Sequence, residues 1–362
     1  MKKRGMNTHA VFATLCSAVI ATTGHGQAPA QAVAQPAELA VPSGFKVSVF
    51  ASELNGARLM TVSPEGVLLV ARRPRNEVVA LPDKNNDGKA EPEVILSNLP
   101  NAHSLAFKDG YLYIATTPAV MRVKWADGKP VGDPEKFADL PSSTPSVHVS
   151  RTINVGPDGR LYVAIGSSCN VCVESDPRRT TIQVINADGS MQPYARGLHN
   201  AIGFDWDPQT RRMWADDTGQ DNLGDDYPPD EINQLEAGKH YGFPFFVAGN
   251  QPNVSQPELK DAKPDTTAHA AVPPVLELPP HSTGMDLRFY RGTQFPAAYR
   301  NALFLAFHGS ARKKRLQGRA RDDERRTPDR ARGFRHGVSE GRRCAGAPRR
   351  PRDRGRRSAL HF

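Results

Sequence analysis

The amino-acid sequence predicts an all-β fold, a six-bladed β-propeller, from three observations. Gly and Pro are abundant, at 30 and 31 of 362 residues, which suits many short strands joined by turns. A turn that leads into an apolar strand recurs four times along the chain. The spacing of these copies, together with the length of the segment that contains them, gives the number of blades.

The recurring unit is a tight turn, in most copies with a glycine, that leads into an apolar strand. It is found in four segments, Ser63–Ala71, Phe107–Ala115, Gly156–Ala164 and, in a looser form, Asp207–Ala215. Equivalent strand positions, the first of them Leu68, are separated by 44, 49 and 52 residues. This period is typical of propeller blades, whereas a β-sandwich does not predict matched turns at near-constant spacing.

The number of blades follows from the length of the repetitive segment. Glu38 to Ser310 spans 273 residues. At about 50 residues a blade, this length holds roughly five and a half blades. Because a closed ring needs a whole number, residues 40–310 are expected to form a six-bladed propeller whose closing blade is incomplete in this chain.

The N-terminal segment is typical of a secretion signal. Lys2, Lys3 and Arg4 precede a short apolar run, Val11 to Thr22, which is too short to span a membrane comfortably. We therefore expect a signal peptide over residues 1–28, a flexible Ala/Pro/Gln-rich lead-in over 29–39, and a periplasmic or secreted protein with no membrane span in the mature chain.

Residues 311–362 differ from the rest of the chain in composition. They contain 19 Lys+Arg and 6 Asp+Glu, a net charge of +13, which leaves the first 310 residues at −4 although the whole chain is at +9. Only five of these residues are Val, Ile, Leu or Phe, too few to form a core. The segment is interpreted as a disordered basic tail or as the product of a shifted reading frame. Because the body is not basic, no nucleic-acid partner is expected.

Two polar stretches at strand ends supply the candidate catalytic and binding residues. The first, Ser146 to Ile153, precedes a blade strand and contains His148 and Arg151. An imidazole titrates near neutrality, so His148 is a candidate general base, with a structural histidine as the alternative. The second stretch, Tyr194 to Asp205, contains His199 and Asn200, and its alternative is an ordinary turn between strands.

The third stretch, Trp214 to Asn233, is dense in carboxylates, glycines and side-chain amides. Calcium prefers oxygen ligands of this kind, and an acidic solvated loop is the alternative. Cys169 and Cys172 form a C-x-x-C motif, for which a local disulfide is expected in an exported protein, ahead of a redox pair or a metal site.

Together these motifs resemble the pyrroloquinoline-quinone (PQQ) sugar dehydrogenases of the glucose/sorbosone dehydrogenase family, and the sorbosone branch in particular. The resemblance covers about residues 40–310. Four runs carry it: H-x7-G-P-D-G-x-L-Y-V-x-I-G from His148 to Gly166, Tyr194 to Gly203, Asp230 to Pro244, and Phe295 to Ser310.

The resemblance implies an enzyme that oxidises a small sugar with PQQ and Ca²⁺ and passes electrons to an external acceptor that the sequence does not identify. His148 would remove the proton from the anomeric hydroxyl, with Arg151 beside it. His199 and Asn200 would contact the quinone, and backbone carbonyls at Gly219 and Gln220 would bind Ca²⁺.

Three departures from the family weaken this expectation. His199 replaces an arginine, Ser167 stands where soluble glucose dehydrogenase has an acidic residue that orients the histidine, and the region that supplies several cationic contacts is replaced by the basic tail. A non-catalytic propeller that binds a sugar or a protein therefore stays open. So do a calcium-dependent lactonase-like hydrolase and a damaged gene product that does not fold stably.

Overall fold

Short antiparallel strands make up the fold in the computed structural model, which describes residues 41–142, 146–253, 256–262 and 271–309 and the backbone of 334–335. The chain divides into two units, Met1–Pro36 and Ala37–Phe362, and the first lies wholly outside the described residues. The predicted signal peptide and lead-in also lie outside them, as does nearly all of the predicted tail. No helix in the described part of the chain could cross a lipid bilayer.

Four four-stranded antiparallel sheets follow one another along the second unit. The first blade consists of β1 (Ala57–Val62), β2 (Leu68–Arg72), β3 (Glu77–Leu81) and β4 (Glu93–Leu96). The second consists of β5 (Ser104–Lys108), β6 (Tyr111–Ala115), β7 (Ala119–Ala126) and β8 (Lys129–Asp139). The third consists of β9 (Arg151–Val155), β10 (Leu161–Ile165), β11 (Thr181–Ile185) and β12 (Met191–Arg196). The fourth consists of β13 (Phe204–Trp206), β14 (Met213–Asp217), β15 (Asp230–Leu235) and β18 (Leu276–Leu278).

A fifth sheet is incomplete in the described residues. It contains the antiparallel hairpin β19 (Gly284–Phe289) and β20 (Leu303–Phe307), and β21 (Phe334–Arg335) pairs parallel to β20. The other elements are a two-stranded hairpin in the fourth-blade region, β16 (Phe246–Val247) with β17 (Gln251–Pro252), and three 3₁₀ turns, η1 (Arg73–Arg75), η2 (Pro257–Leu259) and η4 (Ala297–Tyr299).

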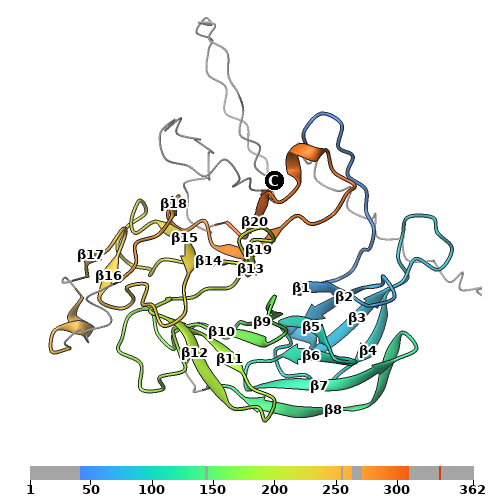
Figure 1. Cartoon of the computed structure of the whole chain (residues 1–362), viewed down its shortest axis with the longest axis horizontal. Coiled ribbons are helices and arrows are strands. Elements are labelled where there is room, and N and C mark those ends of the chain that lie inside the picture. The colour runs from blue at the N-terminus through green and yellow to red at the C-terminus, as the bar shows by residue number, and fades with distance from the viewer. Residues whose placement is uncertain (1–40, 143–145, 254–255, 263–270, 310–333, 336–362) are drawn as a thin grey trace, which may run out of the picture. The chain divides into compact units, whose positions relative to one another are not determined.

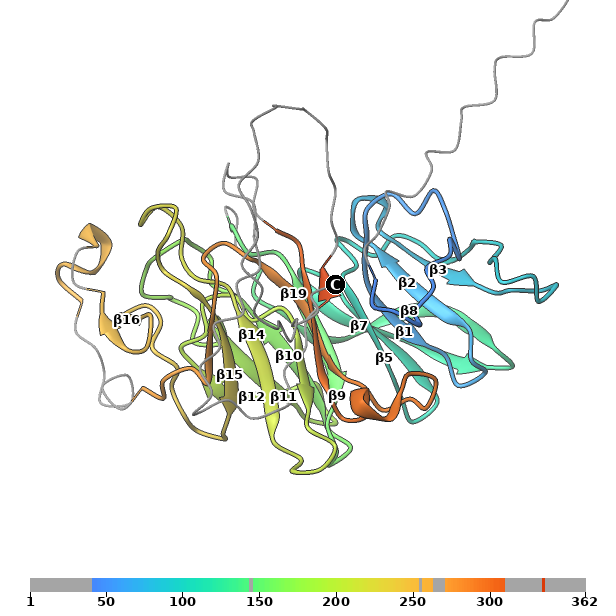
Figure 2. The ribbon, with the colours of Figure 1, turned by 90° about the horizontal axis from the view of Figure 1, so that it is seen from above.

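The sheets are arranged as propeller blades, with the first strand of each on the inside. β1 contacts β5, β5 contacts β9, β9 contacts β13, and β13 contacts β19. Figure 1 shows these strands next to one another, while β4, β8, β12 and β18 lie outside them. Figure 2 shows the same blades from above. The all-β propeller is therefore confirmed with four complete blades and part of a fifth, and six blades are not confirmed.

Each pair of neighbouring blades shares an apolar core. The core between the first and second blades includes Leu69 and Leu112, that between the second and third includes Tyr113 and Val163, and that between the third and fourth includes Phe204. A smaller core that includes Leu287 joins the fourth blade to the β19–β20 hairpin. Because a four-stranded sheet has two faces to bury, this stacking is what stabilises each blade.

All four copies of the predicted turn connect the innermost strand of a blade to its second strand. In three of them the glycine has a positive φ, +87° at Gly66, +75° at Gly110 and +76° at Gly159, a conformation that side chains with a Cβ adopt only with strain. The fourth, looser copy places Arg211 at +59°. The sequence repeat and the blade repeat therefore coincide.

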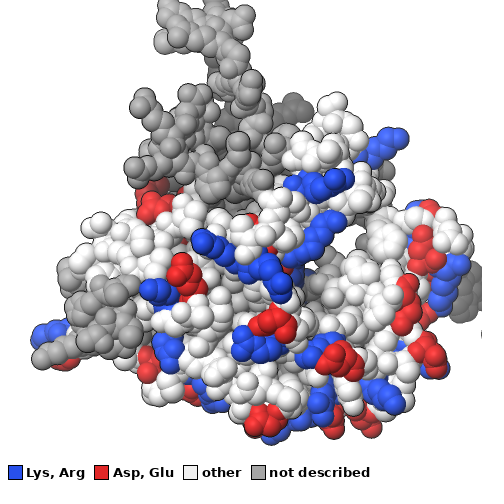
Figure 3. Space-filling model, in the orientation of Figure 1, with Lys and Arg blue, Asp and Glu red and all other residues white. Residues whose placement is uncertain are grey.

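The described surface carries charges of both signs. Figure 3 shows Lys and Arg side chains interspersed with Asp and Glu over the blades on one face. Some are paired in exposed salt bridges, such as Arg122 with Glu135 and Arg160 with Asp158.

Candidate active site

The predicted site residues lie at one end of the blades because of where they stand relative to the strands. His148 precedes β9, Ser167 follows β10, His199 lies between β12 and β13, and Thr218 follows β14. In an antiparallel sheet, the start of one strand lies beside the end of the next. These loops therefore meet at the end opposite to the four repeated turns, and the side chains of the third and fourth blades come into contact there.

His148 is held through one ring nitrogen. Its Nδ1 lies 2.8 Å from Ser167 Oγ and 3.1 Å from the backbone oxygen of Ser167. The carbonyl can only accept, and the Ser167 hydroxyl donates its proton to the carbonyl of Cys169 at 2.6 Å. Nδ1 must therefore be the protonated nitrogen in the neutral ring, which leaves the lone pair on Nε2.

Burial keeps this imidazole neutral. Burial first, and then the neighbouring His199, lower the pKa of His148 from 6.5 to about 3. At neutral pH the ring is therefore a base with an available lone pair at Nε2, the state that proton abstraction from a hydroxyl requires.

Arg151 lies beneath this histidine and is fully buried. Its guanidinium donates to the backbone carbonyls of His148 at 3.0 Å, Ser150 at 2.7 Å and Pro141 at 2.7 Å. A second buried arginine, Arg179, donates to the carbonyls of Gly166 and Pro141, both at 3.3 Å. Because its guanidinium donates to backbone carbonyls, that of His148 included, Arg151 positions the backbone of His148 in this structure.

His199 connects His148 to the fourth blade. Its ring centroid lies 4.6 Å from that of His148 at an interplanar angle of 88°, and 4.7 Å from that of Phe243. Nδ1 donates to the carbonyl of Thr218 at 2.6 Å, and Nε2 is buried with no hydrogen-bond partner among the described residues. Burial lowers the pKa of His199, so at neutral pH this position carries no cation.

A buried carboxylate fixes the loop that carries His199 and Asn200. Asp217, which ends β14, accepts the backbone N–H of His199 at 2.9 Å and that of Asn200 at 2.6 Å. The Asn200 side chain lies against Gly166, where an added Cβ would be 2.5 Å from Asn200 Oδ1 and 3.0 Å from His148 Cβ. Gly166 therefore allows His148 and Asn200 to approach one another.

A small cavity lies on the other side of His199. Its volume is about 30 Å³, room for a metal ion or about two water molecules. The predicted metal-binding residues Gly219 and Gln220 line it, together with Asp217 and Glu231. Gln220 accepts a hydrogen bond from Asn253 Nδ2 at 2.7 Å through Oε1, and its Nε2 has no partner within the described ranges.

The carboxylates beside this cavity carry a desolvation cost. Burial is the main cause that raises the pKa of Asp217 well above its usual range and that of Glu231 to about 7. Asp217 and Glu231 are also directly opposed across the β14–β15 pair. A bound cation would relieve both effects, and carboxylate and carbonyl oxygens are the ligands that Ca²⁺ prefers.

The acidic stretch from Trp214 to Asn233 is therefore not simply a solvated loop. Its two ends are the strands β14 and β15, with Asp216, Asp217 and Asp230 buried, and only its middle is exposed. The sequence did not reveal this division, because the polar residues hide the strand alternation. A signal was present in Met213 to Ala215, which resembles the apolar strand that follows each of the other turns.

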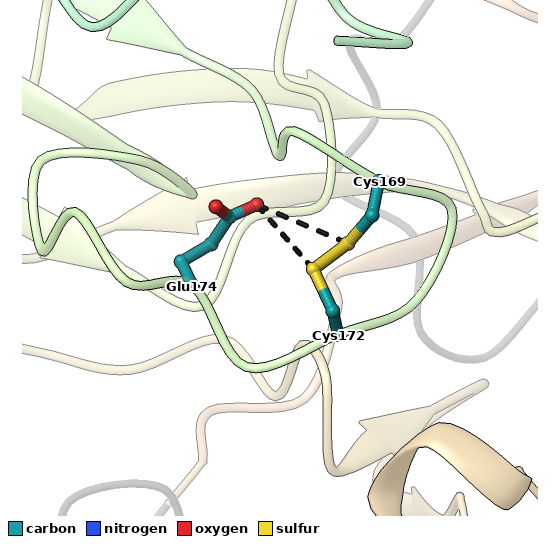
Figure 4. A group of neighbouring side chains, drawn as sticks. All are labelled: Cys169, Cys172 and Glu174. Atoms are coloured by element: carbon teal, nitrogen blue, oxygen red, sulfur yellow. Dashed lines mark hydrogen bonds between the residues drawn. A yellow bond between two sulfur atoms is a disulfide. The ribbon is translucent and has the colours of Figure 1, made fainter. Parts of the chain in front are cut away.

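The two cysteines of the C-x-x-C motif are joined in the structure. Cys169 and Cys172 form a disulfide with Cα atoms 6.1 Å apart, in the loop that follows β10. Glu174 Oε1 lies 4.0 Å and 3.9 Å from the two sulfur atoms, as Figure 4 shows. The pairing accounts for both thiols, so in this state neither can ligate a metal as a thiolate.

Comparisons with known proteins identify the family and support the fold. The TrAA12-like family profile matches residues 39–320. An uncharacterized protein of Borreliella burgdorferi is 30% identical over 285 residues, which are 75% of this chain and 72% of that protein.

Among solved structures, the holo form of the PQQ domain of pyranose dehydrogenase from Coprinopsis cinerea is similar, with 17% identity, a TM-score of 0.61 and 76% of each chain covered. The calcium structure of a Trichoderma reesei carbohydrate-active enzyme of family AA12 shares 18% identity, with a TM-score of 0.58 over 69% of this chain and 74% of that one. These likenesses support the same propeller fold.

The profile covers well over half of the chain, including all four runs that carry the predicted resemblance. The resemblance to the quinoprotein sugar dehydrogenases that the motifs predicted is thereby confirmed, and this chain belongs to the TrAA12-like family.

Proposed function

We propose that this chain is an exported quinoprotein dehydrogenase that oxidises an aldose or a sugar aldehyde with PQQ and Ca²⁺. The observation that carries the proposal is the hydrogen bonding of His148, in which Nδ1 is the donor and Nε2 keeps its lone pair. A neutral imidazole with a fixed tautomer and an available Nε2 lone pair can accept the proton of a hydroxyl. Membership of the family and the PQQ domain among the similar structures support the same activity.

The residues present fit a calcium ion better than they fit the whole quinone. The cavity beside His199 offers Asp217, Glu231 and the backbone at Gly219 and Gln220, a set of oxygen donors suited to Ca²⁺. For the quinone, His148, His199 and Asn200 lie together at the mouth. No Lys or Arg is among the described residues that line the cavity, so these residues offer no cation to its carboxylates.

In the proposed reaction, His148 Nε2 accepts the proton of the anomeric hydroxyl. Arg151 and Ser167 hold the backbone and the ring so that this nitrogen keeps its direction. Phe243 packs against His199 and restricts the movement of its ring. When bound, the quinone supplies the acceptor for the sugar's hydride, and Ca²⁺ supplies the charge that makes it electrophilic.

Dye reduction tests the proposal. The full chain, supplied with PQQ and CaCl₂, should reduce an artificial dye in the presence of aldoses, and EDTA should abolish the reduction. His148→Gln should lower kcat by about 10²–10⁴-fold, the usual contribution of a general base. Lactone hydrolysis without quinone would instead support the hydrolase, and sugar binding without either reaction would support a binding propeller.

We also propose that the complete domain has six blades. Met60 and Val62 pair with Val70 and Leu68, so they share the face of the first blade that is turned away from the second blade. They are 53% and 58% exposed, as expected for a blade face that no neighbouring blade covers among the described residues. Sequencing of the gene across codons 305–320 tests this, because another reading frame that encodes a turn and strands would supply the closing blade.

A further inference from the structure

The disulfide closes a short loop that lies directly beside the proposed base. Ser167, Cys169 and Cys172 are within six residues of one another, and Ser167 is fully buried while the two cysteines are partly exposed. Ser167 Oγ donates to the Cys169 carbonyl at 2.6 Å, so the backbone of the first cysteine is the acceptor that holds the serine hydroxyl. The disulfide is therefore part of a partly exposed loop that contacts a buried group.

The loop is anchored at several points besides the disulfide. Ser168 donates through its backbone N–H and its hydroxyl to the carboxylate of Glu174. Asn170 exchanges two hydrogen bonds with the backbone of Asp221, at 2.9 Å and 2.7 Å, which ties the third blade to the fourth. With the disulfide in place, the Cys169 carbonyl is fixed between these anchors.

The position of that carbonyl decides which nitrogen of His148 carries the proton. The Ser167 hydroxyl has one proton and gives it to Cys169, so it can only accept from His148 Nδ1. If the carbonyl moves away, the hydroxyl can rotate and donate to Nδ1, and the ring proton then belongs on Nε2. A ring with Nε2 protonated is not a base toward the substrate.

The backbone oxygen of Ser167 limits the size of this effect. It lies 3.1 Å from His148 Nδ1 and continues to accept from it after the hydroxyl has turned. Opening the loop should therefore mix the two tautomers rather than exchange one for the other.

We propose that the Cys169–Cys172 disulfide loop is a positioning element for His148, which fixes the imidazole tautomer through Ser167 and makes the base sensitive to the redox state of the two cysteines. Reduction by a phosphine such as TCEP breaks the S–S bond with two electrons from phosphorus. One water molecule supplies the two protons of the thiols and the oxygen of the phosphine oxide. The activity consequence rests on the proposed function, whereas the tautomer consequence does not.

Histidine NMR tests the tautomer directly. The full chain is labelled with ¹⁵N-histidine, and the His148 signal is assigned by its loss in His148→Gln. We expect a protonated Nδ1 in the wild type. After TCEP reduction, desalting under nitrogen and a free-thiol count, a population with a protonated Nε2 should appear. Ser167→Ala removes the hydroxyl that would donate to Nδ1 and keeps the backbone oxygen as acceptor, so this variant should keep Nδ1 protonated after reduction. If the ring signals of the reduced protein equal those of the oxidised protein, the inference is wrong.

Kinetics provide the second test. The reduced wild type and the Cys169→Ser/Cys172→Ser double variant should each show kcat lower by about tenfold, the effect of one hydrogen bond, with KM for the sugar within about twofold. TCEP treatment should leave the double variant unchanged. Ser190→Ala, which removes a hydroxyl from an exposed turn, is the matched control for Ser167→Ala and should have wild-type kcat.

The two tests separate the possible failures. If the wild type shows no dehydrogenase activity, the proposed function fails and NMR still decides the role of the loop. If the wild type is active and its kcat is the same before and after reduction, the loop has no positioning role. Thermal unfolding of each variant confirms that the comparison is made between folded proteins.

Discussion

Asp205 provides a quantitative test of how the fifth sheet is attached to the fourth blade. Its carboxylate is almost fully buried and accepts the backbone N–H of Trp206 and of Phe289, each at 2.8 Å. It also accepts two hydrogen bonds from Arg291, at 2.7 Å and 2.9 Å. Phe289 is in β19, so this one side chain joins two successive blades.

The cost of Asp205→Ala follows from these contacts. Two backbone donors lose their acceptor in a buried place, at about 1–3 kcal/mol each. The Arg291 side chain is half exposed, so its ion pair contributes no more than about 1 kcal/mol. Together these losses should lower the free energy of unfolding by about 2–7 kcal/mol, a large part of the total for a domain.

Urea unfolding followed by tryptophan fluorescence and circular dichroism measures this loss, and Trp206 reports from the joint itself. Asp188→Ala is the matched control, because that carboxylate accepts from Ser190 in an exposed turn, and it should cost less than about 1 kcal/mol. If Asp205→Ala costs no more than the control, then this carboxylate does not hold the hairpin on the fourth blade.

Three further predictions concern the site and its surroundings. Gly166→Ala would force Asn200 away from His148 and should destabilise the fold by about 1–3 kcal/mol while lowering kcat, measured by unfolding and dye reduction. Burial lowers the pKa of His103 from 6.5 to about 3, so the unfolded chain binds a proton that the folded chain does not, and stability is lost as pH falls below 6.5. Urea unfolding at pH 6.5 and 5.0 should show about 2 kcal/mol less acid sensitivity in His103→Gln than in the wild type. Burial raises the pKa of Glu231 to about 7, so its stabilising contribution is present below pH 4.5 and is lost as the pH rises through 7. Glu231→Gln should therefore raise Tm at pH 8 but not at pH 4.5. CaCl₂ should raise the Tm of the wild type at pH 8 more than that of the variant.

The propeller was predictable because its repeat is local. Four or five consecutive residues form the turn before each of Leu68, Leu112 and Leu161, and the strand follows directly. The blade count was harder, since it depends on how the sequence closes the ring, and that information lies near and beyond Ser310. Four complete blades and a hairpin are what the described residues support.

The site was predictable in its members but not in their roles. His148 and His199 lie 51 positions apart in the sequence. The family motifs assigned both to one site, and their rings are in contact in the structure. Arg151 was predicted as a catalytic residue beside His148, and the structure places its guanidinium against backbone carbonyls, that of His148 among them. The sequence spacing cannot distinguish a catalytic arginine from a structural one, because either would stand three residues after His148.

The role of Ser167 follows from its hydrogen-bond partners and not from its residue type. As a replacement for an acidic residue it lacks the charge that would stabilise an imidazolium. Its hydroxyl nevertheless fixes the orientation of His148, because the Cys169 carbonyl takes its only proton. A hydroxyl between two partners is directional in a way that its residue type alone does not reveal.

The separation between the four repeated turns and the candidate site has a practical consequence. The turn that contains Gly159 lies at the far end of β9 from His148, about 16 Å away for a five-residue strand. Peptide tags, fluorophores or tethers to a solid support placed at these turns would leave the chemistry untouched. The protein could thus be fixed to an electrode in a known orientation, with its mouth open to the solution.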